Sequence, residues 1–379
     1  MKILMINSVC GIRSTGRICT DLATEFERDG HTVKIAYGRE GVPEKYQGYA
    51  VRIGSDADVR ISAVHTRLTD KHGFANKRAT KKFLAWAEAY DPDLLWLHNL
   101  HGYYINVEML FAWIKSRPRM QVRWTLHDCW AFTGHCTHFT YAGCDQWKSR
   151  CVKCSETREY PAAYKDNCQQ NYQRKKAAFT GVANMTLITP SYWLADLAQK
   201  SFLGAYPVEV RHNTIDTSVF KPTESNFRQQ YHLEGKKIIL GVASGWNDKK
   251  GLGDFAKLAG ILSEDECIVL VGVTEAQKKQ LPPAILSITR TDSTRRLAEI
   301  YTASDVFVNL TYEDTYPTVN LEAQACGTPC LTYRTGGSVE SVPPENVVDV
   351  GDLEGMYKLI MTRNKKAEGK ARLGEAENR

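Results

Sequence analysis

The stretch SDVFVNLTYEDTYPTVNLEAQACGTPCLTYRTGG, residues 304–337, decides the fold of the second half of the chain. It begins with a run from Val306 to Thr311 that predicts a buried strand, and a helix is expected to begin near Pro317. A second strand is expected from Cys330. Ligands of parallel α/β sheets bind beyond the carboxyl ends of strands, so a site is expected in the loop between strand and helix.

That loop and the helix after it carry three carboxylates, Glu313, Asp314 and Glu322. A carboxylate can accept two hydroxyl hydrogen bonds at once, so the group suits a ligand with several hydroxyls. The alternative is a solvated acidic loop that binds nothing. Other parts of the sequence are needed to distinguish a ligand site from a solvated loop.

Length and composition restrict the class of protein. A chain of 379 residues is too long for one ordinary core, which predicts two domains. Its net charge of +6 is mild and no long basic run occurs, so nucleic-acid binding is not indicated. The first residues, MKILMINSV, are expected to form a strand, not a signal peptide, and no apolar run approaches the roughly 20 residues that span a bilayer. A cytoplasmic protein is therefore expected.

Apolar runs alternate with amphipathic stretches in both halves, which predicts two mainly parallel, doubly wound α/β sheets. In the first half, strands are expected near 2–9, 31–37, 49–53, 93–98, 122–127, 185–191 and 208–213. A helix is expected before Gly30, with Ile18, Leu22, Ala23 and Phe26 on one face, and further helices are expected at 77–89, 106–116 and 192–202. In the second half, strands are expected near 237–244, 267–273, 285–290, 305–310, 329–333 and 346–350, with helices at 252–262, 293–304 and 318–326.

The boundary between the halves is expected near Phe220, where polar residues and Pro222 interrupt the apolar pattern. This gives two Rossmann-like domains, 1–220 and 221–363, which are expected to face each other across a ligand-binding cleft. Residues 364–379 are charged and predicted to form a loose tail.

Histidines follow two predicted strands of the first domain. In TLHDCWAFTGHC (125–136), His127 and Asp128 are adjacent at a strand's carboxyl end, where they can face a bound sugar. His98 and His101 are weaker candidates that are expected to be half-buried supports. A lone histidine is more often structural, so the prediction for His127 depends on the neighbouring carboxylate and on its place at an expected site.

Residues 129–170 form a cysteine-rich insertion with little apolar periodicity. A structural zinc held by four thiolates could replace its missing core, and the first choice of ligands is Cys136, Cys144, Cys151 and Cys154. The alternative ligands are Cys129, His135, His138 and Cys168. Free thiols are the second interpretation. A disulfide is the least favoured, because a reducing compartment is expected.

Glycines and lysines mark two further turns. The turn from Gly11 to Arg17 lacks the GxGxxG pattern of a dinucleotide site, but Gly16 would let the backbone approach a ligand. Lys249 and Lys250 precede a predicted helix, where they would offset charge on a leaving diphosphate. A plain tight turn and a solvated lysine pair are the alternatives.

These residues together resemble the retaining, nucleotide-sugar-dependent glycosyltransferases of family 4, which have the GT-B fold. The resemblance covers nearly the whole chain, and its strongest segments are EDTYPTVNLEAQACGTP (313–329), TLHDCWAFTGHC (125–136), KKG (249–251) and TPSYWLA (189–195). The segment 129–155 is similar to the subgroup that builds bacterial exopolysaccharide, capsule or O-antigen units.

The resemblance implies roles for the candidate catalytic residues. Glu322 would hold the ribose of the nucleotide, and Asp314 would lie near the donor sugar, where the family usually has Glu. Glu313 would only support them. His127 matches the family's active-site histidine, which contacts the donor sugar.

For the diphosphate, Lys250 matches the family's lysine, but Gly245 stands where an arginine is usual, so Lys249 is expected to compensate. Gly16 matches a loop near the diphosphate and the acceptor.

The resemblance also implies a reaction. A sugar would pass with retention, and without a metal, from a nucleotide-diphosphate donor to a lipid-linked saccharide at the inner membrane surface. A UDP-sugar is favoured over a GDP-sugar. The basic segment RATKK (78–82) would hold the protein there by weak electrostatics. The alternatives are a non-catalytic sugar-nucleotide-binding protein of the same fold and a sugar-nucleotide epimerase or phosphorylase.

Overall fold

The computed structural model describes residues 1–363, and the charged tail predicted at 364–379 lies outside the described residues. Within that range no helix combines the length and the apolar character that crossing a membrane would need.

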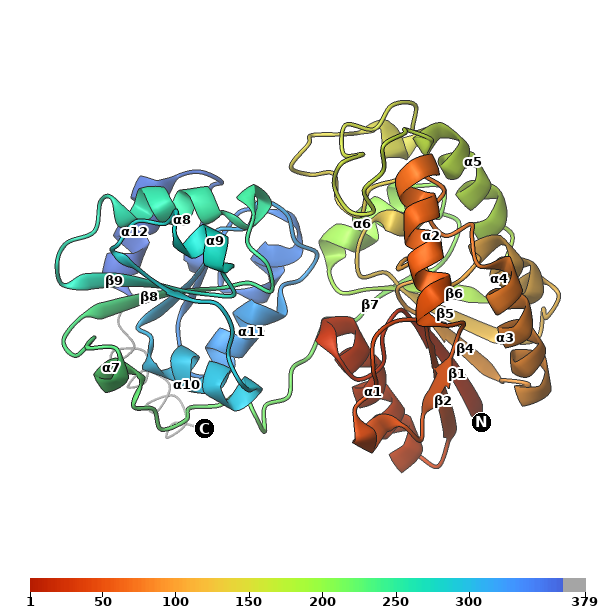
Figure 1. Cartoon of the computed structure of the whole chain (residues 1–379), viewed down its shortest axis with the longest axis horizontal. Helices are drawn as coiled ribbons and strands as arrows, with labels where there is room; N and C mark the ends of the chain where they lie inside the picture. Colours follow the sequence, from red (N-terminus) through yellow and green to blue (C-terminus); the bar gives the residue numbers. More distant parts are fainter. Residues whose placement is uncertain (364–379) are drawn as a thin grey trace. The chain divides into compact units, whose positions relative to one another are not determined.

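The chain forms two compact units that divide between His212 and Asn213 (Figure 1). The division comes before the predicted boundary at Phe220. Phe220 is buried in the core of the second unit with Phe227 and Tyr301, so the polar segment before it already belongs to that unit.

The first unit is built on a seven-stranded parallel sheet with the order β3-β2-β1-β4-β5-β6-β7. Leu4 and Ile6 of β1 face one core cluster, and Ile3 and Met5 face the other. Because both faces are covered, the inner strands are apolar throughout. The strands are β1 (Lys2–Asn7), β2 (Thr32–Tyr37), β3 (Ala50–Arg52), β4 (Leu94–Leu97), β5 (Gln121–Thr125), β6 (Met185–Thr189) and β7 (Val208–Val210).

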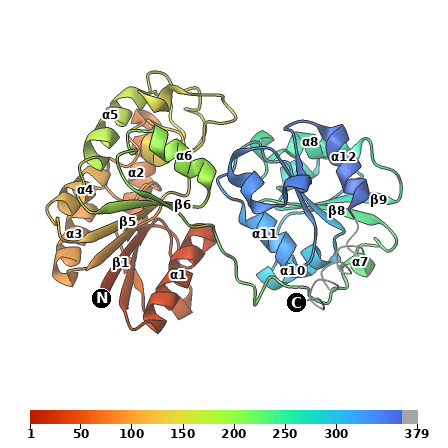
Figure 2. The ribbon, with the colours of Figure 1, turned by 180° about the vertical axis from the view of Figure 1, so that it is seen from behind.

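Helices cover both faces of this sheet. Helix α1 contributes Leu22 and Ala23 to one cluster, and α3 and α4 contribute Phe83 and Phe111 to the other. Helix α2 lies in front of the sheet in Figure 1 and behind it in Figure 2. The helices are α1 (Arg13–Arg28), α2 (Asp56–Thr69), α3 (Lys77–Tyr90), α4 (Val107–Lys115), α5 (Cys168–Phe179) and α6 (Tyr192–Lys200).

The second unit has a six-stranded parallel sheet with the order β10-β9-β8-β11-β12-β13. Its strands also alternate, with Ile239 and Val308 in one cluster and Ile238 and Phe307 in the other. Its strands are β8 (Lys237–Val242), β9 (Glu266–Val271), β10 (Ile285–Ile288), β11 (Val306–Asn309), β12 (Cys330–Tyr333) and β13 (Val347–Val348). Its helices are α7 (Phe227–Gln230), α8 (Leu252–Ala259), α9 (Glu275–Lys278), α10 (Thr294–Ala303), α11 (Thr318–Ala325) and α12 (Leu353–Thr362).

The α/β class predicted from the alternation is confirmed, and two helices of the first unit were not expected. Helix α5 begins at Cys168, inside the segment predicted to be an irregular insertion. Helix α2 buries the polar side chains of Ser62 and Thr66, so its pattern does not indicate a core-facing helix. Apolar periodicity fails as a signal wherever the buried side of a helix is polar.

Candidate active site

The loops that leave the neighbouring strands β8 and β11 meet at the carboxyl edge of the second sheet. After β8 the chain forms a 3-10 turn, Asp248–Lys250, and after β11 it forms the acidic loop. The N–H of Tyr312 donates to the carbonyl oxygen of Lys249 at 2.8 Å, which ties the loops together. The two lysines and the acidic loop, which are far apart in the sequence, are therefore neighbours.

Gly251 is the reason these loops can approach so closely. Its φ of +76° is left-handed, and a Cβ atom on it would lie 2.2 Å from the carbonyl oxygen of Leu310. Asn247 fixes the turn by accepting a 3.0 Å hydrogen bond from the N–H of Lys250 through its side chain. A side chain at residue 251 would push the two loops apart.

Lys250 and Asp314 form an ion pair that solvent can reach. The Nζ of Lys250 lies 2.8 Å from Oδ2 of Asp314, and the two side chains are 36% and 21% exposed. The same ammonium lies 3.4 Å from the hydroxyl of Thr311. An exposed pair contributes only about 0–1 kcal/mol to stability. An incoming polyanion can therefore take Lys250 from Asp314 at little cost.

Lys249 and Glu313 form a second pair that is closed to solvent. Their charged atoms are 3.3 Å apart, and the side chains are only 16% and 5% exposed. Removing one partner of a buried pair costs about 3–5 kcal/mol, because the other charge is left uncompensated. This pair holds the loops together, which suits the supporting role predicted for Glu313. Because Lys249 is buried in this pair, it is less accessible to a ligand than Lys250 is.

The backbone around Asp314 is held by glycines. The N–H of Gly337 donates to the carbonyl oxygen of Asp314 at 3.0 Å. A Cβ atom on Gly336, whose φ is +48°, would lie 2.2 Å from that same oxygen. The N–H of Tyr316 donates to Oδ1 of the Asp314 side chain at 3.2 Å. The carboxylate is thus oriented before any ligand arrives.

Glu322 stands on α11 and is almost fully buried. The hydroxyl of Tyr301 donates a 3.1 Å hydrogen bond to Oε2 of Glu322. Burial, together with the charge of Glu322, raises the pKa of Tyr301 well above its usual range, so the phenol stays a donor. Tyr301 therefore fixes the orientation of the Glu322 carboxylate.

In the first unit, His127 lies just beyond β5 and contacts His98. Nδ1 of His98 lies 3.0 Å from Nε2 of His127, and their rings stack with centroids 5.3 Å apart. Burial lowers the pKa of His127 to about 4, and the charge of the neighbouring Asp128 carboxylate partly offsets this lowering. The pKa of His98 is also lowered, mainly by burial. Both rings are neutral at pH 7, so a single proton lies between them.

The position of that proton follows from the far side of His98, whose Nε2 is buried without a hydrogen-bond partner. If His98 donates from Nδ1, this Nε2 is a bare acceptor. If His127 donates instead, His98 must carry a buried N–H with no acceptor, and orphaned buried N–H groups are the rarer case. His98 is therefore the donor, and neutral His127 carries its own proton on Nδ1.

Asp128 is held by His101. Nε2 of His101 lies 2.7 Å from Oδ2 of Asp128, and the N–H of Trp130 donates to Oδ1 at 2.9 Å. Burial opposes ionisation, but His101 and these hydrogen bonds lower the pKa of Asp128 to about 2. The cavity lined by these side chains and the two other histidines is ≈ 10 Å³, which is room for about one water. They can therefore form the wall of a sugar site but cannot enclose a sugar.

Gly16 lies in a different place from the one predicted. Helix α1 already begins at Arg13, so Gly16 belongs to the first turns of the helix, and its carbonyl oxygen accepts from the N–H of Gly11 at 3.1 Å. A Cβ atom on Gly16 would lie 3.1 Å from a methyl group of Val9. Because Gly16 has no side chain, the turn before α1 can pack closely on the helix.

The predicted zinc ligands Cys136, Cys144, Cys151 and Cys154 are not joined by disulfide bonds. A hydrogen bond with Cys136 lowers the pKa of Cys154, and the same contact raises the pKa of Cys136. Throughout residues 1–363, however, no three histidine, cysteine or acidic side chains are grouped as a metal ion requires. The thiols supply a pair in contact but not a ligand set, so zinc stays a prediction and no step is derived from it.

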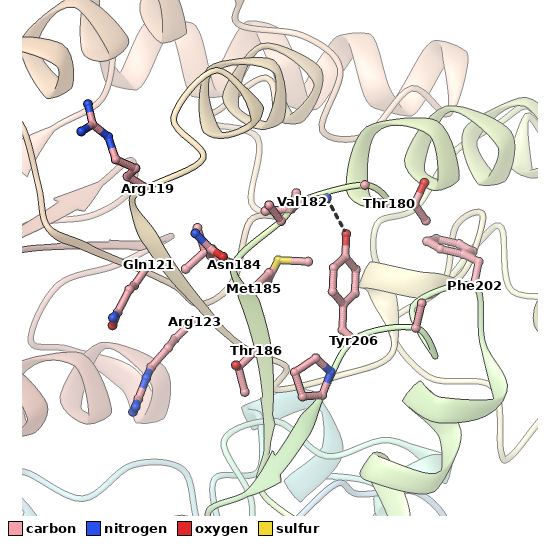
Figure 3. A pocket seen from close by; sticks show the side chains of 15 residues that line it. Arg119, Gln121, Arg123, Thr180, Val182, Asn184, Met185, Thr186, Phe202 and Tyr206 are labelled. Atoms are coloured by element: carbon pink, nitrogen blue, oxygen red, sulfur yellow. Dashed lines mark hydrogen bonds between the residues drawn. The ribbon is translucent and has the colours of Figure 1, made fainter.

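A larger hollow of ≈ 700 Å³ lies at the opposite, amino-terminal edge of the first sheet, around the starts of β5 and β6. Tyr206 is fixed there, because its hydroxyl accepts from the N–H of Val182 at 3.0 Å and donates to the carbonyl of Phe179 at 2.7 Å. The guanidinium groups of Arg119 and Arg123 point away from Tyr206 (Figure 3). Ligand sites need convergent polar groups, so this hollow is not the candidate site.

The sequence of the chain matches the models of two known protein families. The model of "Glycosyltransferase Family 4" matches residues 15–219, which is more than half of the chain. The chain belongs to glycosyltransferase family 4. The model of "Glycosyl transferases group 1" matches residues 223–376.

Among relatives of this family 4 chain is WcaC of Escherichia coli K12, whose name assigns it to colanic acid biosynthesis as a glycosyl transferase. The two are 33% identical over 131 residues, which is 33% of this chain and 32% of WcaC, so the match spans about a third of either protein.

Solved structures support the GT-B fold. Sucrose-phosphate synthase of Thermosynechococcus elongatus superimposes with a TM-score of 0.68 at 15% identity, over 95% of this chain and 88% of that one. HepE of Anabaena, solved in complex with UDP, superimposes with a TM-score of 0.62 at 15% identity, over 96% and 89%. The GT-B prediction is confirmed.

One positioning residue of this family 4 chain, Tyr301, lies outside the motifs that the sequence suggested. Tyr301 contacts Glu322 from α10, a helix that carries no other candidate. His98 was expected only as a support, although its place at the end of β4, beside β5, was a usable signal. No spacing in the sequence indicates the contact between Tyr301 and Glu322.

Proposed function

We propose that this protein is a retaining glycosyltransferase that moves a sugar from a nucleoside diphosphate, with UDP favoured over GDP, to a lipid-linked saccharide during surface polysaccharide synthesis. The observation that carries the proposal is the open ion pair of Lys250 and Asp314 at the carboxyl edge of the second sheet. A cation and a carboxylate that are held together weakly can part to meet a diphosphate and a sugar.

The diphosphate would replace Asp314 as the partner of Lys250. It carries more charge than a carboxylate and offers several acceptor oxygens, so the exchange is favourable for a cation that is already half-exposed. The cation would then stabilise the negative charge that develops on the leaving phosphate. Released from the lysine, Asp314 would accept hydrogen bonds from hydroxyls of the donor sugar.

Glu322 would hold the nucleotide through the ribose hydroxyls. Its orientation is set by the Tyr301 hydroxyl, which occupies one carboxylate oxygen. Since a carboxylate has about four lone-pair positions, it can accept from Tyr301 and from ribose hydroxyls together. The fixed orientation lowers the cost of ordering on binding.

His127 would donate to a hydroxyl of the donor sugar from Nδ1, the nitrogen that the contact with His98 leaves protonated. A neutral imidazole serves this purpose because it keeps one donor in a fixed place. Asp128, ionised and held by His101, would add a nearby acceptor. Retention and independence from a metal belong to the proposal, since they follow from the family resemblance alone.

A non-catalytic sugar-nucleotide-binding protein is the second candidate, and one observation favours it. Gly245 stands where the family has an arginine, so this chain brings one cation fewer to the diphosphate. An epimerase or a phosphorylase has no such observation in its favour.

A panel of nucleotides tests the proposal. UDP, GDP and ADP are added to the full chain, and the unfolding midpoint is measured, because a ligand of the native state raises it. We expect the largest rise with UDP and little or none with UDP in Lys250→Met. The matched control, Lys358→Met, changes an exposed lysine of α12 that pairs with the exposed Glu354, and should respond like the wild type.

Transfer is then followed with UDP-sugars and a lipid-linked acceptor. Product with the anomeric configuration of the donor supports the proposal. Donor binding without product or donor hydrolysis would establish the non-catalytic alternative. A midpoint that no nucleotide raises would overturn both.

A further inference from the structure

Helix α2 has its apolar side chains on the wrong side for a globular core. Ile61, Val64 and Leu68 are 69%, 60% and 54% exposed, whereas Ser62 and Thr66 on the opposite side are buried. A surface helix normally buries its apolar stripe and exposes its polar side. The stripe on α2 is therefore a contact surface that the rest of the first unit does not cover.

Arginines flank the stripe. Arg60 and Arg67 are exposed, and they lie four residues before and three residues after Val64, which puts them on the same side of the helix. The acidic residues of the helix are already engaged, since Asp56 pairs with Arg52 and the side chain of Asp58 caps the helix start. The exposed side of α2 is thus both apolar and positively charged.

The insertion extends this surface past the carboxyl end of the helix. The N–H of Tyr164 donates to the carbonyl oxygen of Arg67 at 2.8 Å, and the guanidinium of Arg67 lies 5.8 Å from the centre of its ring. Tyr164 is 78% exposed. Figure 1 shows the insertion loops beyond this end of α2. We call Arg60, Ile61, Val64, Arg67, Leu68 and Tyr164 together the α2 face.

We propose that the α2 face binds the surface of an anionic lipid bilayer. Aliphatic side chains and a tyrosine can enter the boundary between headgroups and acyl chains, while the arginines meet the phosphates. A nucleic acid would match the charge but leave the aliphatic stripe in water. A second copy of the chain would cover the stripe but bring arginines against arginines, which opposes pairing.

This inference rests on the proposed function, because binding to a bilayer would bring the protein to its lipid-linked acceptor. It also differs from the interpretation drawn from the sequence, in which RATKK (78–82) on α3 holds the protein. Lys81 and Lys82 are exposed, but their helix turns its apolar side chains, such as Phe83, to the core. The two surfaces can be separated by substitution.

The test is co-sedimentation of the full chain with vesicles of phosphatidylcholine alone or with one third phosphatidylglycerol, without donor or acceptor. We expect binding only to the anionic vesicles. The triple variant Ile61→Ser, Val64→Ser and Leu68→Ser should reduce the partition coefficient about tenfold or more, since three aliphatic side chains no longer leave water. Arg60→Gln with Arg67→Gln should reduce it several-fold at low salt and less at high salt.

Two matched controls separate the surfaces. Ile261→Ser with Met361→Ser changes exposed apolar side chains of the second unit and should leave binding unchanged. Lys81→Gln with Lys82→Gln should reduce binding less than the arginine pair. Since every substituted side chain is exposed, unfolding midpoints should stay within about 2 °C of the wild type.

The inference is overturned if the triple variant binds vesicles like the wild type or if the lysine pair has the larger effect. It is also overturned if sedimentation velocity shows a dimer that the triple variant abolishes. Failure of the proposed function would look different: vesicle binding would persist while no nucleotide raises the unfolding midpoint.

Discussion

The carboxyl edges of the two sheets are built on different principles. In the second unit the candidate residues are ions that neutralise one another, Lys249 with Glu313 and Lys250 with Asp314. In the first unit the central pair, His98 and His127, is neutral and is ordered by one shared proton. The edge of the second sheet would bind a ligand through charged side chains. The edge of the first sheet would bind it through a histidine whose donor is held in a fixed orientation.

The difference has consequences for substitution. In the charged edge, the effect of losing a residue depends on how far its partner is buried, because solvent can replace an exposed partner but not a buried one. In the neutral pair of His98 and His127 no charge is left behind, so the loss is one of position. Substitutions can therefore separate the effect of charge from the effect of position.

The largest effects are expected at the two neighbouring lysines. Lys250→Met should lower kcat/KM by about 10²–10³-fold, the usual loss when one stabilising group is removed from a developing anion, with the unfolding free energy almost unchanged. Lys249→Met should instead lower the unfolding free energy by about 3 kcal/mol, because Glu313 stays buried without its partner.

Steady-state kinetics and urea unfolding of both variants measure these effects. Lys358→Met is the matched control for loss of a lysine in the same unit, because both Lys358 and its partner Glu354 are exposed. If Lys249→Met loses activity while keeping its stability, the division into an open and a closed pair is wrong.

A second prediction concerns pH at the neutral edge. The folded-state pKa of His127 is about 4, below the ordinary value of about 6.5, so the unfolded state binds more protons between these values. Its contribution to stability should therefore be lost as the pH falls from 6.5 toward 4. Protonation also turns Nε2 of His127 into a donor and breaks the contact with His98, so kcat/KM should fall below about pH 5.

The pH profile of kcat/KM, together with unfolding at each pH, tests this. In His127→Asn the acidic fall should move or disappear, because the side chain no longer titrates. An unchanged acidic limb in that variant would assign the titration to another group.

These two edges also show what the sequence could predict. The order of the strands follows from alternating apolar runs, and the acidic loop, the lysines and His127 follow from their places after strands, whereas helices such as α2 and α5 do not follow from such runs. The difference between the two ion pairs does not, because Lys249 and Lys250 are adjacent in sequence and only the packing of the loops buries one of them. The contacts of Tyr301 and His98 depend likewise on tertiary structure.

A third, smaller effect is expected at His98, a positioning residue. His98→Leu removes the donor that fixes the proton of His127 but leaves no charge unpaired. The net value of one hydrogen bond is about 1 kcal/mol, so kcat/KM should fall about five- to tenfold, mainly through kcat. His98→Gln, which can still donate toward His127, should recover part of the loss. Equal losses in both variants, matched by equal losses of stability, would reduce His98 to a packing role.

The smallest effect is a gain, at the position where this chain departs from its family. A Cβ atom on Gly245 would meet nothing within 4 Å, and no left-handed φ is required there, so a longer side chain fits. Gly245→Arg should therefore add a cation near the open pair and lower the KM for the donor a few-fold, with the effect weaker at high salt. Gly245→Gln, of similar length but uncharged, is the matched control.

If arginine and glutamine act alike at residue 245, the added charge does not reach the diphosphate. Donor binding at the carboxyl edge of the second sheet would then depend on the conformation of the loops and not on charge alone.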